Sequence, residues 1–257
     1  MAEITAEKRV VVRPDAVSLA AEVATRFIGR LIARTSAGKT THVSLTGGSM
    51  GGRVLAAAAA DPRLEQVDWS LVHFWWSDER FVPRGDADRN DAAAYAALLD
   101  AVAAPENVHT VAGSDDGLGL DAAAAAYAAE LARFADPEVG AWPSFDICFL
   151  GVGPDAHIAS LFPDRPEIRV TEAAALAVRD SPKPPPERIT VTRPVINSSR
   201  RVWLVLTGAD KASALGLAVA GASYQSVPAA GAKGRKATVF FVDETAAAQL
   251  PPESVTD

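Results

Sequence analysis

Short apolar runs alternate along the chain with longer stretches in which apolar residues recur at helical spacing. The apolar runs are typical of buried strands, and they predict strands at Val10–Arg13, Thr41–Leu45, Leu71–Trp76, Phe145–Leu150, Arg188–Thr192, Arg201–Leu206 and Ala237–Val242. The stretches between them predict helices from Asp15 to Gly38 and at Val54–Ala60, Asn90–Leu99, Leu120–Phe134 and Lys211–Ala220. Strands that are separated by helices require crossover connections. The pattern therefore predicts an α/β fold, with a mostly parallel sheet that helices cover on both faces.

The length of the chain, 257 residues, is compatible with one large domain or two small ones. One stretch resembles a linker: Ser181–Glu187, which contains four prolines and favours extended backbone. It is either a domain boundary or a fixed loop beside a site, and apolar strand residues follow it directly. We expect a single α/β domain over residues 1–250 and a frayed tail over residues 251–257.

Composition narrows the class of protein. Apolar residues make up 49% of the chain and the net charge is −7, which argues against binding nucleic acid through bulk charge, since that requires clustered lysines and arginines. The single cysteine, Cys148, excludes internal disulfides and cysteine-based zinc sites. No run approaches the ~18 apolar residues of a membrane span, and the first residues lack the pattern of a signal peptide. We expect a soluble, cytoplasmic protein that binds neither nucleic acid nor membrane.

Glycines and polar residues directly follow four of the predicted strands. These segments are Thr46–Gly52, Ser77–Arg80, Gly151–His157 and Thr207–Lys211. The carboxyl ends of parallel strands meet at one edge of a sheet, and open α/β sheets bind their ligands there. We therefore expect glycines, hydroxyls, carboxylates, an imidazole and two cations to gather at that edge.

Two nucleotide-binding motifs fit the chain poorly. Gly38-Lys39-Thr40 is similar to the end of a P-loop, but Ala33 occupies the position of its first glycine and the segment precedes a strand. Gly151–Ala156 fits the dinucleotide fingerprint and follows a strand. However, Asp155 would place a negative charge beside a pyrophosphate, and no clear second strand ends in an acid ~20 residues later. We expect no nucleotide cofactor.

The segment Gly47–Gly51 (GGSMG) admits two interpretations. It matches the G-x-S-x-G elbow of α/β-hydrolases, in which Ser49 would act with His157 and either Asp146 or Asp155. No HGGG-type oxyanion loop accompanies it, and only two predicted strands precede the serine. Alternatively, a glycine-rich turn that opens a helix presents free N–H groups and a positive dipole end to a phosphate. We favour anion binding, with Ser49 as a donor to phosphate, and keep the serine esterase as an alternative.

The remaining histidines and the cysteine carry no motif. We expect packing or solvent-facing positions for His42, His73 and His109, and a buried, inert thiol for Cys148. His157 differs from them because it lies on a glycine-rich loop after a buried strand, two residues after a carboxylate. Loops at strand ends often carry function, so we expect a functional role for this histidine.

Taken in order, five segments of the chain resemble the 6-phosphogluconolactonase family, whose wider family includes glucosamine-6-phosphate deaminases. They are TGGS, WSDERFVP, FLGVGPDAHIASLFP, SPKPPPERITVT and TGADKA, and the resemblance spans nearly the whole chain. It implies a three-layer α/β architecture like that of amino-sugar-phosphate isomerases, ribose-phosphate isomerases and CoA transferases. It also implies hydrolysis of 6-phospho-D-glucono-1,5-lactone to 6-phosphogluconate in the oxidative pentose phosphate pathway.

The resemblance also implies roles for particular residues. His157 matches the catalytic histidine, the proposed general base, and Asp155 matches the carboxylate on the same loop. Asp78 and Arg80 match the family's Asp-Glu-Arg segment at the catalytic site. One departure is visible, because Ala156 replaces the usual glycine. If that position requires a positive φ, the alanine adds some strain.

The same resemblance implies a grip on the sugar phosphate. Lys211 matches the lysine that closes on the phosphate, and Arg188 is matched to the same task. Gly47, Gly48 and Ser49 match the sugar-phosphate loop. The implied partner is therefore a small sugar-phosphate lactone, and we expect the chain to be a monomer or a weak dimer.

The implied chemistry is consistent with these residue types. A δ-lactone is an activated ester, and a neutral His157 can take a proton from the attacking water. Arg80 or nearby backbone N–H groups can offset the charge of the oxyanion. Lys211 and the turn at Gly47–Ser49 can hold the distant phosphate and so position the carbonyl. No metal or redox cofactor is required.

Two further functions stay as alternatives. In the deaminase branch a glutamate stands just before the proline that follows the histidine loop. Here Phe162 precedes Pro163, and a phenyl ring cannot transfer protons, so the lactonase branch is favoured. Non-catalytic sugar-phosphate sensors with this fold carry an N-terminal DNA-binding domain. The first predicted strand begins near Val10, which leaves no room for one.

Overall fold

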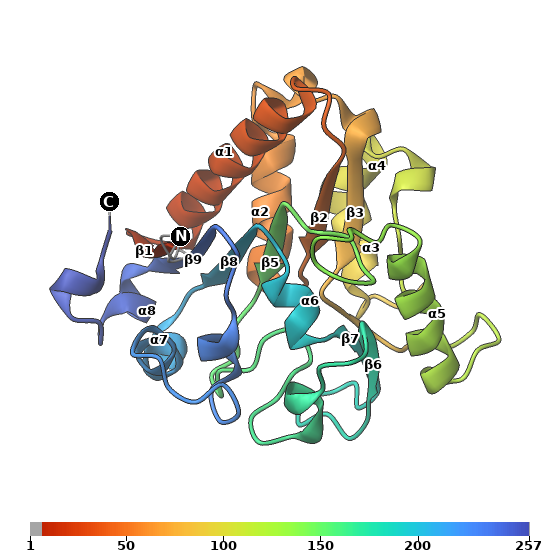
Figure 1. Ribbon diagram of the computed structural model, residues 1–257. Helices are drawn as coiled ribbons and strands as arrows, with labels where there is room; N and C mark the ends of the chain where they lie inside the picture. The colour runs from red at the N-terminus through yellow and green to blue at the C-terminus, as the bar shows by residue number, and fades with distance from the viewer. Residues whose placement is uncertain (1–6, 257) are drawn as a thin grey trace.

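A six-stranded sheet forms the centre of the computed structural model, which describes residues 7–256 (Figure 1). The strand order is β1-β9-β8-β5-β2-β3, and every neighbouring pair is parallel. The strands are β1 (Glu7–Arg13), β2 (Thr41–Leu45), β3 (Val72–Trp76), β5 (Ile147–Leu150), β8 (Arg201–Leu206) and β9 (Ala237–Asp243). Each lies within a few residues of an apolar run that predicts a strand.

Helices cover both faces of this sheet. One layer consists of α1 (Ala16–Thr35), α2 (Gly48–Ala59), α3 (Asn90–Ala94) with its π-helical continuation η3 (Tyr95–Leu99), and α4 (Asp100–Val102). The other consists of α5 (Leu120–Ala132), α6 (Arg193–Asn197), α7 (Ala212–Val219) and α8 (Glu244–Ala247). Among residues 7–256, no helix is long and apolar enough to cross a bilayer.

Side-chain alternation along the strands separates the two cores. On β8, Trp203 and Val205 pack in the core under α1 and α2, whereas Val202 and Leu204 pack in the core under α5 and α7. Successive residues of a strand point to opposite faces, so a continuous apolar run can supply both cores. The predicted α/β fold, with a mostly parallel sheet between two helical layers, is confirmed.

A second, antiparallel sheet adjoins the first and was not predicted. It contains β4 (Asp78–Arg80), β7 (Arg188–Val191) and β6 (Ala175–Val178), in the order β4-β7-β6. The expected strand Arg188–Thr192 thus belongs to this small sheet and not to the parallel one. β4 escapes sequence reasoning because it has three charged residues and pairs with a segment far along the chain. Its register places Arg80 opposite Arg188.

The edge strand β1 is covered in part by the C-terminal segment. Val10 donates its N–H to Thr256 Oγ1 at 3.0 Å, and the N–H of Thr256 donates to the carbonyl of Val10 at 2.8 Å. Thr256 lies in the stretch that the sequence predicts to fray. These bonds occupy backbone groups that an edge strand otherwise offers to another chain.

The three histidines without a motif pack together against Trp75. The rings of Trp75 and His109 stack with centroids 3.8 Å apart, and His73 Nδ1 lies 2.9 Å from His109 Nε2. The indole N–H of Trp75 donates to His42 Nδ1 at 3.0 Å, which requires a neutral acceptor nitrogen. Burial, with a smaller contribution from the neighbouring histidines, lowers the pKa of His42 to about 3.

This packing predicts that acid destabilises the protein through His42. Below the ordinary histidine pKa of ~6.5 the unfolded chain binds a proton at His42, whereas the folded chain stays neutral there down to about pH 3. The stability from the neutral ring is therefore complete above pH ~6.5 and is lost as the pH falls. At pH 5 the loss is about 2 kcal/mol of the free energy of unfolding.

The variant His42→Gln tests this, because its amide oxygen can still accept the Trp75 N–H but does not titrate. Urea unfolding at pH 7.5 and pH 5 should show a pH-dependent loss about 2 kcal/mol smaller in the variant than in the wild type. Comparison of the two proteins cancels the other titrating groups. An equal loss in both would contradict the prediction.

Candidate active site

The segments that follow β2, β3, β5 and β8 surround one open cavity of about 260 Å³. The cavity is lined by Thr46, Gly47, Gly48, Asp78, Arg80, Asn90, Gly151, Val152, Gly153, His157, Ala159, Lys183, Pro184, Arg188 and Lys211. The site residues expected from the sequence all line this cavity, with the exception of Ser49 and Asp155. Four of the lining side chains are lysine or arginine and one is a carboxylate, so the cavity suits an anionic small molecule.

The loop after β5 folds back on itself and places His157 at the cavity. The N–H of Gly153 donates to the carbonyl of His157 at 3.0 Å, and the N–H of Ala156 donates to the carbonyl of Gly153 at 2.9 Å. A Cβ on Gly153 would lie 2.1 Å from His157 Nδ1, so only glycine permits this approach. Ala156 has a φ of 67°, the left-handed conformation that costs an alanine about 1 kcal/mol.

Asp155 lies behind His157 and sets the tautomer of its ring. Asp155 Oδ1 is 2.5 Å from His157 Nδ1. Burial by itself would raise the pKa of Asp155, but the hydrogen bond and the charge of His157 outweigh it and lower the pKa to about 2. An ionised carboxylate only accepts hydrogen bonds, so Nδ1 carries the proton. In the neutral form of the ring, Nε2 then carries the lone pair.

Phe162 packs against the imidazole of His157. Its ring centroid lies 4.7 Å from that of His157, and the side chain is buried. The guanidinium of Arg188 lies over the Phe162 ring, 5.9 Å from its centroid. Phe162 therefore supports the imidazole as an apolar surface and brings no titrating group to the cavity.

The glycine-rich loop after β2 opens α2 earlier than expected. The helix begins at Gly48, not at Val54, because glycines obscure the helical pattern while their backbone still forms the first turn. The first N–H groups of a helix have no partner within it. Ser49 is exposed in this turn and lines an adjoining cavity of about 190 Å³, together with Thr207 and Lys211. The loop therefore presents N–H groups and a hydroxyl next to a lysine.

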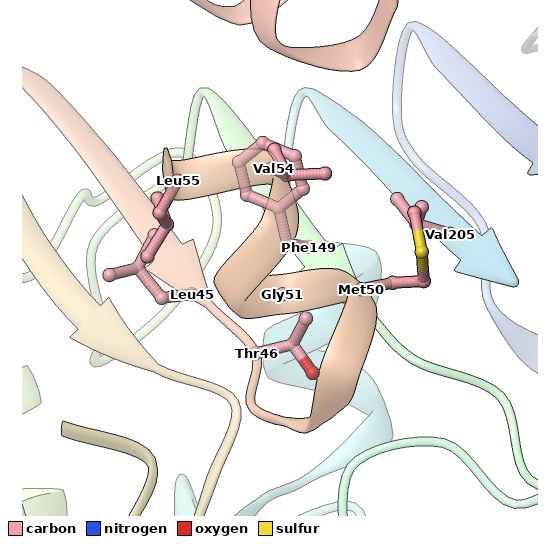
Figure 2. A pocket seen from close by; sticks show the side chains of 8 residues that line it. All are labelled: Leu45, Thr46, Met50, Gly51, Val54, Leu55, Phe149 and Val205. Atoms are coloured by element: carbon pink, nitrogen blue, oxygen red, sulfur yellow. The ribbon is translucent and has the colours of Figure 1, made fainter. Parts of the chain in front are cut away.

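Apolar packing behind the loop holds this first turn in place (Figure 2). Figure 2 shows the Met50 side chain pointing toward Val205, and the gap that these residues enclose is only about 10 Å³. Gly51 allows the turn to approach the preceding strand end, because a Cβ there would lie 2.3 Å from the carbonyl oxygen of Thr46. The gap is a packing space and is far smaller than a ligand cavity.

The cations of the cavity differ in how they are held. Arg80 donates through Nη1 to the carbonyl of Asp88 at 2.5 Å, and its buried Nε has no partner within the described part of the chain. Lys211 contacts Asp210 at 2.7 Å and lies between the two cavities. A buried donor without a partner is costly, while the guanidinium as a whole keeps a positive charge at the wall of the cavity.

Arg188 binds mainly to the proline-rich segment. Its Nη2 donates to the carbonyls of Lys183 at 2.9 Å and Pro184 at 3.1 Å, and its Nε donates to the carbonyl of Pro185 at 3.2 Å. The segment Ser181–Glu187 therefore lies beside the site as a loop to which Arg188 is bonded. Burial lowers the pKa of Arg188, although the charge of Asp78 opposes this.

Asp78 is buried at the end of the cavity and is already bonded. Ser160 Oγ donates to its Oδ2 at 2.7 Å, and Arg188 Nη1 lies 3.9 Å from the same oxygen. Ser160 comes from the loop that carries His157, so this bond connects β4 to the histidine loop. Asp78 therefore orients Ser160 and Arg188 and also lines the cavity.

Three polar side chains of the cavity wall were not singled out as site residues from the sequence: Thr46, Asn90 and Lys183. Thr46 Oγ1 accepts a hydrogen bond from the N–H of Gly151 at 3.2 Å and so connects the loops after β2 and β5. Lys183 lies in the proline-rich segment, which was itself a signal of a loop near a site. Asn90 carried no signal beyond its position at the start of a predicted helix.

The serine triad is not assembled. Asp146 precedes β5, at the opposite edge of the sheet, where Arg30 donates to it at 2.8 Å and 3.0 Å. Ser49 lines the adjoining cavity and not the cavity wall that carries His157. Only the Asp155–His157 pair of the proposed triad is in place. In the described residues, no three His, Cys, Asp or Glu side chains are grouped so as to hold a metal ion.

Comparisons with known proteins identify the family of the chain. The family model for glucosamine-6-phosphate isomerases/6-phosphogluconolactonase matches residues 14–241. The chain is 47% identical to a 6-phosphogluconolactonase of Streptomyces coelicolor over 95% of each chain. It is 46% identical to one of Mycobacterium tuberculosis, over 93% of this chain and 96% of that protein.

Solved structures show the same fold. The 6-phosphogluconolactonase of Trypanosoma brucei is similar with a TM-score of 0.82 at 24% identity, covering 96% of this chain and 100% of that chain. A monomeric glucosamine-6-phosphate deaminase is similar with a TM-score of 0.76 at 16% identity, covering 93% and 99%. The strand-end cavity, the histidine loop and these matches together show that the chain belongs to the family of glucosamine-6-phosphate isomerases and 6-phosphogluconolactonases.

Proposed function

We propose that the chain hydrolyses 6-phospho-D-glucono-1,5-lactone to 6-phosphogluconate. The observation that carries this proposal is the Asp155–His157 pair in a cationic cavity beside the start of α2. The curated relatives at 46% to 47% identity bear the name of this enzyme, which supports the same substrate. The residues that line the cavity lie between Thr46 and Lys211, within the single α/β domain that we propose for residues 1–250.

His157 acts as the general base in this proposal. Ionised Asp155 accepts from Nδ1–H and leaves Nε2 to take a proton from water. The water oxygen then attacks the lactone carbonyl carbon. When the bond between that carbon and the ring oxygen breaks, the imidazolium returns the proton to the ring oxygen. The products are a carboxylic acid, which ionises, and a free hydroxyl.

Arg80 offsets the negative charge that develops on the carbonyl oxygen. Its guanidinium lines the cavity and is held by the carbonyl of Asp88, and a fixed donor near developing charge stabilises a transition state without reorganisation. The phosphate is held at the other end by Lys211 and by the first turn of α2, whose N–H groups and dipole favour anions. This remote grip positions the carbonyl for attack.

The deaminase alternative lacks its proton-transfer group. Phe162 occupies the position just before Pro163 and packs as an apolar surface on His157. The structure favours hydrolysis over isomerisation for this reason. The serine esterase alternative requires a hydrogen bond between Ser49 and His157, and among the described residues the His157 ring is bonded to Asp155 and not to Ser49.

Removing the base should abolish most of the activity. In His157→Gln, the amide cannot take a proton from water, so kcat should fall by about 10²- to 10⁴-fold while KM changes little. The assay generates the lactone in situ and follows its loss above the spontaneous rate. If the purified wild type does not accelerate the loss, the proposed function is wrong. If His157→Gln keeps full kcat, the role of His157 is wrong.

Removing the phosphate grip should mainly weaken binding. Lys211→Ala deletes a charged contact worth about 2 kcal/mol, so KM should rise about thirtyfold with a smaller change in kcat. Ser49→Ala deletes one neutral donor, and its KM should rise less, about fivefold. A serine-directed phosphonate should leave turnover intact. Labelling of Ser49 together with loss of turnover would favour the esterase.

A further inference from the structure

A buried carboxylate lies directly behind the cavity, outside the mechanism just described. Glu79 is the middle residue of β4, between Asp78 and Arg80, and it is 1% exposed. It does not line the cavity. Buried carboxylates are rare unless hydrogen bonds or charges compensate for them, so the contacts of this one indicate what it does.

Three backbone N–H groups converge on the Glu79 carboxylate. Oε1 accepts from the N–H of Arg80 at 2.8 Å and from that of Asn90 at 2.7 Å. Oε2 accepts from the N–H of Asp91 at 2.9 Å. Asn90 and Asp91 begin α3, so one side chain of β4 holds the first turn of a helix that lies 11 residues further along the chain.

Asn90 connects Glu79 to the wall of the cavity. Its Nδ2 donates to the carbonyl of Asp78 at 2.9 Å, and its side chain lines the cavity. A Cβ placed on Gly47 would lie 1.7 Å from Asn90 Oδ1, so the side chain lies directly against the backbone of the phosphate loop. Glu79 is thus connected to Arg80 by its own bond, and to Asp78 and Gly47 through Asn90.

Two other charges and a phenol lie near the Glu79 carboxylate. Arg89 is fully buried, with Nη2 at 3.9 Å from Glu79 Oε2 and 2.6 Å from Asp91 Oδ2. The hydroxyl of Tyr127 on α5 is bonded to the backbone N–H and carbonyl of Trp76 at 2.9 Å, at the end of the strand that precedes β4. Burial, and then the charge of Asp91, raise the pKa of Glu79 to about 7, although the N–H donors and Arg89 oppose the rise.

We propose that Glu79 is a positioning residue for the hydrolysis: its carboxylate fixes Arg80 and Asn90 relative to the phosphate loop at Gly47. The inference rests on the proposed function, since it concerns the same site. Both oxygens must accept for all three donors to be satisfied. A protonated or amidated side chain supplies one good acceptor and turns a donor toward the third N–H. The start of α3 then shifts, and small displacements of binding groups reduce catalysis.

The variant Glu79→Gln tests this by copying the protonated state. At pH 8 its kcat/KM should be about tenfold below that of the wild type. At pH 6 the wild type is itself mostly protonated at Glu79, so the difference should shrink to about twofold. If the carboxylate only stabilised the fold, the ratio of wild-type to variant kcat/KM would be the same at pH 8 and at pH 6. A constant ratio, or a variant as active as the wild type at pH 8, would overturn the proposal.

A second variant keeps the test decisive if Glu79→Gln folds poorly. Asn90→Ala removes the side chain through which the carboxylate acts on Asp78 and Gly47. We expect the ratio of wild-type kcat/KM to that of Asn90→Ala to decrease from pH 8 to pH 6, as it does for Glu79→Gln. In the double variant the losses should not multiply, because the second change removes a contact that is already broken. Independent, multiplying losses would also overturn the proposal.

Glu130→Gln is the matched control. Glu130 is a partly buried carboxylate with hydrogen-bonded partners, His109 and Arg133, but it lies away from the cavity. Its kcat and KM should equal those of the wild type at both pH values. Wild-type activity separates the two hypotheses. An inactive wild type contradicts the proposed function, whereas an active wild type with an unaffected Glu79→Gln contradicts only the positioning role.

Discussion

The parallel pairing of β2, β5 and β8 is the constraint on which the rest of the site depends. These three strands are direct neighbours in the sheet, so the loops that follow them must begin side by side. The glycine loop, the histidine loop and the segment with Lys211 come from positions more than 150 residues apart at the extremes. Their meeting is a result of backbone hydrogen bonds between strands, and the Thr46–Gly151 bond shows how closely two of the loops are joined.

The second sheet adds the charges that the parallel sheet lacks. β4 and β7 bring Asp78, Arg80 and Arg188 to the cavity in one antiparallel register. The whole chain has a net charge of −7, but the cavity is lined by more positive than negative side chains. Carboxylates near it are bonded to specific partners: Asp155 to His157, and Asp78 to Ser160. A protein can thus be acidic as a whole and still bind an anionic substrate.

The elements that the sequence predicts correctly are those whose signal lies in neighbouring residues. The strands of the parallel sheet, the histidine loop and the start of α1 next to Asp15, whose Oδ1 accepts from the N–H of Ser18, all follow from nearby residues. The prediction failed where the signal is not local. The strand β4 is three charged residues, and its only reason to be extended is a partner more than 100 residues away. The start of α2 was placed too late because glycine is a poor helix former even where it opens a helix.

The sequence by itself determined the α/β class, the parallel sheet and the kinds of residue that follow its strands. Hydrophobic periodicity and turn-forming residues depend only on positions close together in the sequence. It also carried the resemblance on which the substrate rests. Only the tertiary structure decided that Ser49 and His157 line different cavities, that Arg188 holds the proline-rich loop, and that Glu79 supports Asn90. The physical reason is that hydrogen bonds between distant segments depend on directions and distances, which no spacing along the chain records.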